Sequence, residues 1–157
     1  MTKRLTAVIC GVVFAMMSQS VQAKDNLDNG IVWQDLFQDP AWQTEFMEQK
    51  IHEYFPDERV AQIMIAIASC ESTGPGSDQI VQWEPDGKLL HNRDGGQARG
   101  AFQVMMFTHA DEMKRLGLHI GNIDDYMTFV KILYQQGRFA PWESSRDCWQ
   151  QERVAQN

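Results

Sequence analysis

The sequence predicts a predominantly α-helical fold of the α+β class, with one small β-hairpin in a single domain. Three observations predict it. Apolar residues recur at helical spacing before residue 72 and after residue 100, the stretch between has no helical period, and two short apolar runs there flank a turn. The length of 157 residues suits one domain with a sizeable core.

The first 23 residues have the layout of a secretory signal peptide. Lys3 and Arg4 form a basic start, residues 5–17 are an almost unbroken apolar run, and small residues precede an expected cleavage after Ala23. A membrane anchor is the alternative, but spanning a bilayer takes about 20 apolar residues. We therefore expect an exported, periplasmic or secreted domain of residues 24–157, without stable membrane insertion.

The chain is acidic, which argues against nucleic acid as a partner. Lys3 and Arg4 are the only charged residues before the cleavage site. The exported part thus keeps 12 of the 14 basic residues and all 21 acidic residues, a net charge of −9. Nucleic-acid binding needs a basic patch, and the sequence contains none.

Two helices are predicted before residue 72. The first follows the N-cap Asp39 and has Pro40 at its first helical position. Its apolar stripe comprises Met47, Ile51, Tyr54 and Phe55. The second begins after the N-cap Asp57, runs over residues 58–70 and ends at Glu71. Its second half is apolar on every side, which predicts a central, covered helix.

The segment 72–100 predicts a hairpin. The runs QIVQW (79–83) and KLLHN (88–92) flank EPDG (84–87), in which Pro85 and Gly87 suit a type I turn. Long irregular segments within a domain are usually functional or disordered, and the apolar residues favour a function here.

Two further helices are predicted after residue 100. One begins at Thr108 as N-cap, with Asp111 three residues on, and stops at Gly117. The other begins near Asn122 and closes at Gly137. Its apolar stripe comprises Tyr126, Phe129, Val130, Leu133 and Tyr134. The aromatic tail after residue 139 is expected to pack back on the domain.

Two cysteines remain after cleavage, Cys70 and Cys148. An even pair in an exported chain predicts one disulfide, which would tie the end of the central helix to the C-terminal tail. Two separate buried thiols are the alternative. The pair cannot form a zinc site alone, and the four histidines show no metal-ligand spacing, so we predict neither a metal nor an organic cofactor.

Glu71 is the candidate catalytic residue. It follows an apolar helix at its negative end, and both the helix dipole and the exclusion of water raise the pKa of a carboxyl group placed there. A carboxyl group that stays protonated near neutral pH can give its proton to a glycosidic oxygen. The alternative is a glutamate that faces solvent where the helix ends.

Glu71-Ser72 is followed by a glycine-rich stretch, then by ARGAFQV (98–104) and Thr108, and the chain ends in a segment rich in Trp with one Cys. In this order the motifs resemble the lysozyme-like lytic transglycosylases, particularly small exported members. The resemblance spans residues 60–149. It implies a lysozyme-like fold with the hairpin beside the active-site cleft, and a bacterial envelope setting.

The resemblance also implies roles for individual residues. Glu71 would be the acid/base that cleaves the MurNAc-GlcNAc β-1,4 glycosidic bond of peptidoglycan. Ser72 would be its neighbour in the cleft, and Gly100 and Gln103 would line the sugar groove. Trp83 is a candidate for stacking on a sugar face or for the core. Partners would be peptidoglycan glycan strands and, as a further option, an envelope-spanning secretion machine.

An Ala-Tyr-Asn-Ala-Gly segment common in the family has no clear counterpart, which leaves Tyr126, Tyr134 and Trp142 as candidates opposite Glu71. The tyrosines and Phe102 also fit core positions.

The number of carboxylates separates two reactions. A hydrolysing muramidase ordinarily uses two, whereas a lytic transglycosylase of the resembled kind uses one Glu, and the sugar's own hydroxyl attacks. Asp78 and Asp94 are candidate second carboxylates, while Glu84 and Asp86 are explained by the turn. We expect a one-carboxylate transglycosylase. The alternatives are a muramidase and a non-catalytic module that binds glycan or a partner.

Overall fold

The computed structural model describes residues 36–92 and 94–155, with side chains as far as Gln151. The predicted signal peptide lies outside this part of the chain. Among the helices described, none combines the length and hydropathy that crossing a bilayer requires. The predicted class is confirmed at the coarse level, because the described chain is mostly helical with one two-stranded antiparallel sheet.

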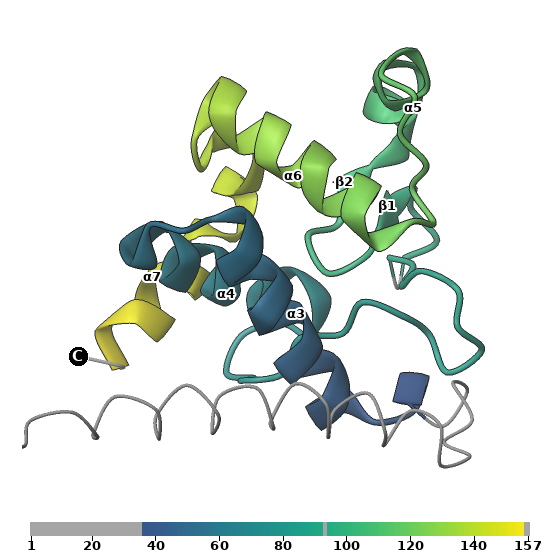
Figure 1. Ribbon diagram of the computed structural model, residues 1–157. Helices are drawn as coiled ribbons and strands as arrows, with labels where there is room; N and C mark the ends of the chain where they lie inside the picture. Colours follow the sequence, from purple (N-terminus) through teal and green to yellow (C-terminus); the bar gives the residue numbers. More distant parts are fainter. Residues whose placement is uncertain (1–35, 93, 156–157) are drawn as a thin grey trace, which may run out of the picture. The chain divides into compact units, whose positions relative to one another are not determined.

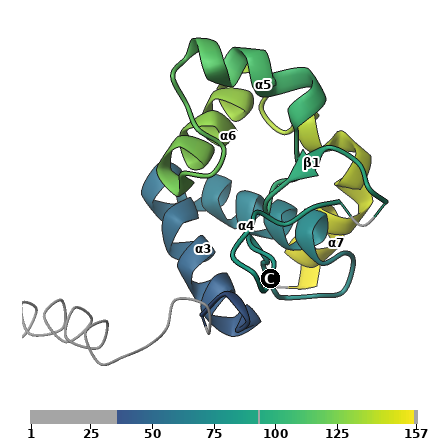
Figure 2. The same ribbon diagram turned by 90° about the vertical axis from the view of Figure 1, so that its right-hand side faces the viewer.

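Helix α4 (Glu58–Ser72) lies at the centre of the helical packing. Its N-cap is Asp57, as predicted, whose side chain accepts hydrogen bonds from the N–H groups of Arg59 and Val60. Most of its residues from Ala61 onward are buried. It contacts α3 (Pro40–Tyr54) and α7 (Arg146–Ala155), and lies between them in both views (Figures 1 and 2). The expectation of a covered central helix is therefore confirmed.

Helices α3 and α6 (Ile123–Gly137) begin at the predicted residues. Asp39 and Asn122 are their N-caps, and each side chain accepts hydrogen bonds from the first backbone N–H groups. The predicted stripe of α6 is buried throughout, and α3 buries Met47 and Ile51 toward the same core. The N-cap residues and the helical spacing of apolar residues therefore predicted the start and the buried face of both helices.

The C-terminal tail packs back on the domain as a 3-10 helix, η1 (Ala140–Ser145), followed by α7, where the sequence predicted only an aromatic tail. Trp142 and Trp149 are both buried, with exposed fractions of 3% and 4%. The Cys70–Cys148 disulfide joins α4 to α7, which confirms the predicted pair. The tail thus covers the end of the central helix.

The predicted hairpin forms only in part. Its turn is present, since the Gly87 N–H donates to the Glu84 carbonyl over 2.9 Å, but the flanking runs pair only through an isolated Trp83–Leu89 bridge. The N–H groups of residues 80–83 instead donate to side-chain oxygens of Thr44, Ser72 and Gln43. Side-chain oxygens thus take up backbone N–H groups that a regular strand pairing would otherwise engage.

The two regular strands lie further along the chain. Strands β1 (Ala98–Arg99) and β2 (Val104–Met105) pair antiparallel across a turn at residues 100–103. An isolated bridge between His91 and Arg99 continues the pairing to the partial hairpin. The small sheet therefore lies after the segment where the sequence predicted it.

The prediction of Thr108 as an N-cap is wrong. Helix α5 (Met106–Arg115) begins directly after β2, with Met105 as N-cap and no side-chain capping bond. The Met106 N–H donates instead to the carbonyl of Gln97 over 3.0 Å, so a strand neighbour takes one of the first free donors of the helix. The stop at Gly117 is confirmed, and this residue has a φ of 71°.

Candidate functional site

An open cleft of about 360 Å³ lies beside the C-terminal end of α4. Its volume is within the range of ligand sites, roughly 300–1,000 Å³. One wall is the end of α4, and the other is the irregular segment that follows it. The lining residues are Cys70, Glu71, Ser72, Thr73, Gly74, Val81, Leu90, His91, Asn92, Asp94 and Gln103. Three of the predicted site residues, Glu71, Ser72 and Gln103, are thus brought together.

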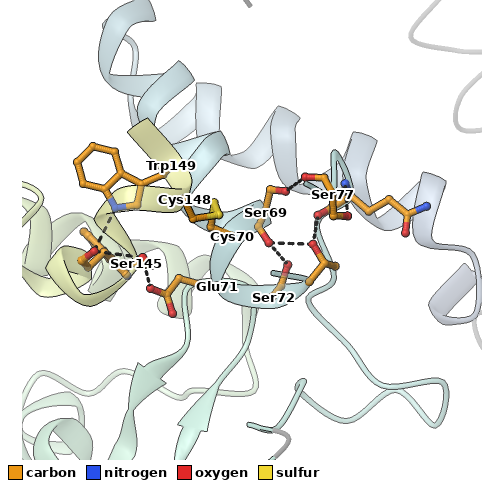
Figure 3. The surroundings of a disulfide bond; sticks show 11 residues. Ser69, Cys70, Glu71, Ser72, Ser77, Ser145, Cys148 and Trp149 are labelled. Carbon is orange, nitrogen blue, oxygen red and sulfur yellow. Dashed lines mark hydrogen bonds between the residues drawn. A yellow bond between two sulfur atoms is a disulfide. The ribbon is translucent and has the colours of Figure 1, made fainter. Parts of the chain in front are cut away.

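Glu71 lies in the last turn of α4, which continues one residue beyond the predicted end. Its side chain is half-buried, and its Oε1 accepts a hydrogen bond of 2.6 Å from the Ser145 hydroxyl (Figure 3). Burial raises the pKa of the Glu71 carboxyl group, and the Ser145 hydrogen bond opposes part of that rise. The direction agrees with the sequence-based expectation, and the cause is desolvation.

Ser72 is buried and connects the two walls. Its hydroxyl accepts a hydrogen bond of 3.1 Å from the N–H of Val81. The preceding residue is held in the same way, because the Ile80 N–H donates to the Thr44 hydroxyl over 2.9 Å. The Ser72 side chain therefore fixes the loop wall against the helix that carries Glu71.

Gln103 faces the cleft from the turn between β1 and β2. Its φ is 45°, an uncommon conformation for a residue other than glycine, and its Nε2 donates to the Gly100 carbonyl over 2.9 Å. Such conformations concentrate at functional sites because the surrounding structure must hold them. The turn therefore presents an oriented amide to the cleft.

Gly100, the first residue of this turn, is buried and is not among the residues that line the cleft. It has a φ of 69°, and a Cβ there would lie 2.7 Å from the hydroxyl oxygen of Tyr126. Its glycine is thus explained by close approach to Tyr126 and by its backbone conformation.

Three buried side chains hold the turn that carries Gln103. Gln82 Oε1 accepts from the Ala101 N–H at 2.6 Å, and the Tyr126 hydroxyl accepts from the Phe102 N–H at 2.8 Å. Trp142 Nε1 donates to the Phe102 carbonyl over 3.0 Å. Since these side chains come from three parts of the chain, the turn is fixed by tertiary contacts.

Of the aromatic candidates opposite Glu71, Tyr126, Tyr134 and Trp142 are all core residues, as is Phe102. Tyr126 lies within electrostatic reach of the acid. Burial raises the pKa of its phenol far above the usual range, and the charge of Glu71 adds to that rise. Tyr126 is therefore a core residue, and its hydroxyl supports the turn that carries Gln103.

Trp83 lies away from the cleft lining, in an aromatic cluster with Phe37, Trp42 and Phe46. Its ring centroid is 5.4 Å from that of Phe37 and 5.5 Å from that of Phe46. The sequence left Trp83 either a sugar-stacking role or a place in the core. Its position favours the second, because the ring packs between α3 and the partial hairpin.

The candidate second carboxylates lie in different places. Asp94 is exposed and lines the cleft, whereas Asp78 is exposed and is not part of the lining. Glu84 accepts a hydrogen bond from the His91 N–H at 3.1 Å. Asp86 pairs with Lys88 Nζ at 2.6 Å, which lowers the pKa of its carboxyl group. Only Asp94 therefore shares the cleft with Glu71.

Sequence reasoning gave no role to Ser145 or Gln82, because each binds a partner far away in the sequence. The one signal for Ser145 was its position three residues before Cys148, which a disulfide to Cys70 brings toward Glu71. Within residues 36–92 and 94–155, no group of three or more potential metal ligands gathers.

The chain matches no protein-family model, and no curated protein or solved structure is significantly similar to it.

Proposed function

We propose that the protein is an exported lytic transglycosylase that cleaves the MurNAc-GlcNAc β-1,4 bond of peptidoglycan in the bacterial envelope. The observation that carries the proposal is the state of Glu71, a half-buried carboxyl group on the cleft whose pKa is raised by burial. A general acid needs such a raised pKa in order to hold its proton near neutral pH. The motif order Glu-Ser, glycine-rich loop and Gly-Ala-Phe-Gln supports the same reaction.

In this reaction Glu71 acts twice. It first gives its proton to the glycosidic oxygen, and the bond between that oxygen and the anomeric carbon of MurNAc breaks as the GlcNAc end leaves with a hydroxyl group. The Glu71 carboxylate then takes the proton of the MurNAc C6 hydroxyl, whose oxygen bonds to the anomeric carbon. The product is a 1,6-anhydro end, and the acid regains its proton.

Gln103 is the proposed sugar contact on the opposite wall. The hydrogen bond from its Nε2 to the Gly100 carbonyl orients the amide, so that Oε1 can accept a hydrogen bond from a sugar hydroxyl. Its strained φ of 45° fits a residue whose position serves the site rather than the turn.

A hydrolysing muramidase is the second candidate, because Asp94 lines the same cleft and could activate water. Its exposure and its place in a polar loop favour the single-carboxylate reaction. A module that binds glycan or an envelope-spanning secretion machine without turnover would not need a desolvated carboxyl group at this position.

Mass spectrometry of the soluble products from purified peptidoglycan tests the proposal. Muropeptides with 1,6-anhydro ends, lighter by one water molecule than hydrolysis products, are expected. Reducing ends would identify a muramidase and direct attention to Asp94. An absence of products would contradict turnover and favour the binding module.

A further inference from the structure

We infer that Ser145 is a positioning residue for Glu71: its hydroxyl occupies Oε1, so that the transferable proton resides on Oε2, the oxygen left for the substrate. This inference rests on the proposed function of Glu71 as the acid. It adds a residue from the C-terminal tail to which the sequence analysis gave no role.

The hydrogen-bond geometry carries the inference. Ser145 Oγ lies 2.6 Å from Glu71 Oε1 and 3.1 Å from the Trp142 carbonyl oxygen. A serine hydroxyl has one proton to donate, and the shorter distance to the carboxyl group makes Glu71 its preferred acceptor. In Figure 3 the other carboxyl oxygen of Glu71 points away from Ser145. While Ser145 donates to Oε1, a proton on that oxygen would face the hydroxyl proton, so protonation is directed to Oε2.

Ser145 is itself held in a rigid frame. The Trp142 carbonyl near its hydroxyl also accepts a hydrogen bond of 3.1 Å from Trp149 Nε1, and both indoles are buried. Trp142 Nε1 in turn donates to the Phe102 carbonyl, one residue before Gln103. The frame thus fixes the Ser145 hydroxyl relative to the turn on the opposite wall of the cleft.

The disulfide cross-links the same two segments as the Ser145–Glu71 hydrogen bond. Cys70 directly precedes Glu71, and Cys148 follows Ser145 by three residues (Figure 3). Because the covalent link limits how far α7 can move from α4, the hydroxyl stays near the carboxyl group in both protonation states of the reaction. A donor to Oε1 stabilises the carboxylate as well as orienting the acid.

Other titratable groups surround Glu71 and must be separated from the effect of Ser145. Tyr126 approaches from α6, and His91 and Asp94 lie on the loop wall of the cleft. Next to Ser145, Glu143 and Arg146 are exposed and pair with each other at 2.8 Å. A His91→Gln background removes the imidazole from the loop wall of the cleft, so that an effect of Ser145→Ala that persists there does not come from His91.

The first test follows the titration of the Glu71 side-chain carboxyl carbon by NMR in the full exported domain. Ser145→Ala should move this titration to higher pH, because the carboxylate loses a donor while burial remains. Ser145→Thr should restore the wild-type titration. Ser144→Ala is the matched control, because Ser144 is the adjacent serine and its side chain is exposed. An unchanged titration in Ser145→Ala would overturn the inference.

The second test is the pH profile of glycan-strand cleavage. Ser145→Ala should lower kcat at the optimum about tenfold and move the alkaline limb to higher pH, with Ser145→Thr restoring both. A purely structural role would lower kcat without moving the limb, and that result contradicts the inference. An inactive wild-type protein would refute the proposed function instead, while the NMR titration would still decide the Ser145–Glu71 pair.

Discussion

The two walls of the cleft are built in different ways. The helix wall is the end of α4, buried by apolar packing and joined to α7 by the disulfide. The loop wall spans residues 73–105, and its described part, residues 73–92 and 94–105, has two strands of two residues each. Its backbone is held by polar side chains, of which Gln43 and Gln82 are almost fully buried at 2% and 1% exposure.

Gln43 shows how the loop wall is held. Its Oε1 accepts hydrogen bonds from the N–H groups of Gln82 and Trp83, while its Nε2 donates to the carbonyls of Phe37 and Trp83. One amide thus satisfies four backbone groups that would otherwise require a neighbouring strand. The comparison teaches that the end of α4, which carries Glu71, is held mainly by apolar packing and a disulfide, whereas the loop wall is held mainly by directional bonds.

Removal of the disulfide should have the largest effect, on the helix wall. The bond closes a sequence separation of 78 residues, so the Cys70→Ala/Cys148→Ala variant should lose about 4 kcal/mol of unfolding free energy. Urea unfolding of this variant beside the oxidised wild type measures the loss. Equal midpoints would mean that the packing of α7 alone holds the helix wall.

Gln43→Ala should have the next largest effect, on the loop wall. It leaves buried backbone groups of the loop without partners, at a cost of about 3 kcal/mol. Gln49→Ala changes the same residue type at an exposed position of α3 and should stay within about 0.5 kcal/mol of the wild type. Similar unfolding curves for the two variants would refute the polar account of this wall.

Gly100→Ala tests the contact between the turn and Tyr126. Gly95 has a similar φ of 72° but nothing within 4 Å of its would-be Cβ, so Gly95→Ala reports backbone strain alone. The Gly100 variant should be less stable than the Gly95 variant by about 2 kcal/mol, owing to the clash with Tyr126. Chemical unfolding of the pair measures the difference, and equal losses would show that the turn can move.

The smallest expected effect is on the pH dependence of stability. Because the folded-state pKa of Glu71 lies above its ordinary value of 4.5, the folded protein binds more protons than the unfolded chain between those two pKa values. Stability should therefore fall as pH rises through that window, and Glu71→Gln should remove this part of the fall. Denaturation across pH, with the exposed Glu45→Gln as control, measures it. A slope unchanged by Glu71→Gln would contradict the burial of the acid.

The helix wall could be predicted from the sequence because its determinants are local. Asp57 caps α4 next to an apolar stripe, as Asp39 and Asn122 do for α3 and α6, and the prediction of a Cys70–Cys148 disulfide is confirmed. The position of Glu71 followed from the same pattern.

The loop wall could not be predicted, because its determinants are distant in sequence. The Gln43 and Gln82 side chains bind backbone groups 40 and 19 residues away, and nothing in a polar side chain's own neighbourhood indicates such a partner. The Ser145–Glu71 bond spans 74 residues for the same reason. The expected hairpin is only partly paired for a similar reason, because side chains of Thr44, Ser72 and Gln43 accept the N–H groups of its first run.

The most direct test of the central claim is the release of 1,6-anhydro muropeptides by the wild type, Glu71→Gln and Asp94→Asn. If Glu71 is the single acid/base, Glu71→Gln should lose activity about a thousandfold while remaining folded. Asp94→Asn should remain within a few-fold of the wild type. An active Glu71→Gln variant would contradict the one-carboxylate account. So would an inactive Asp94→Asn variant combined with reducing ends among the products of the wild type.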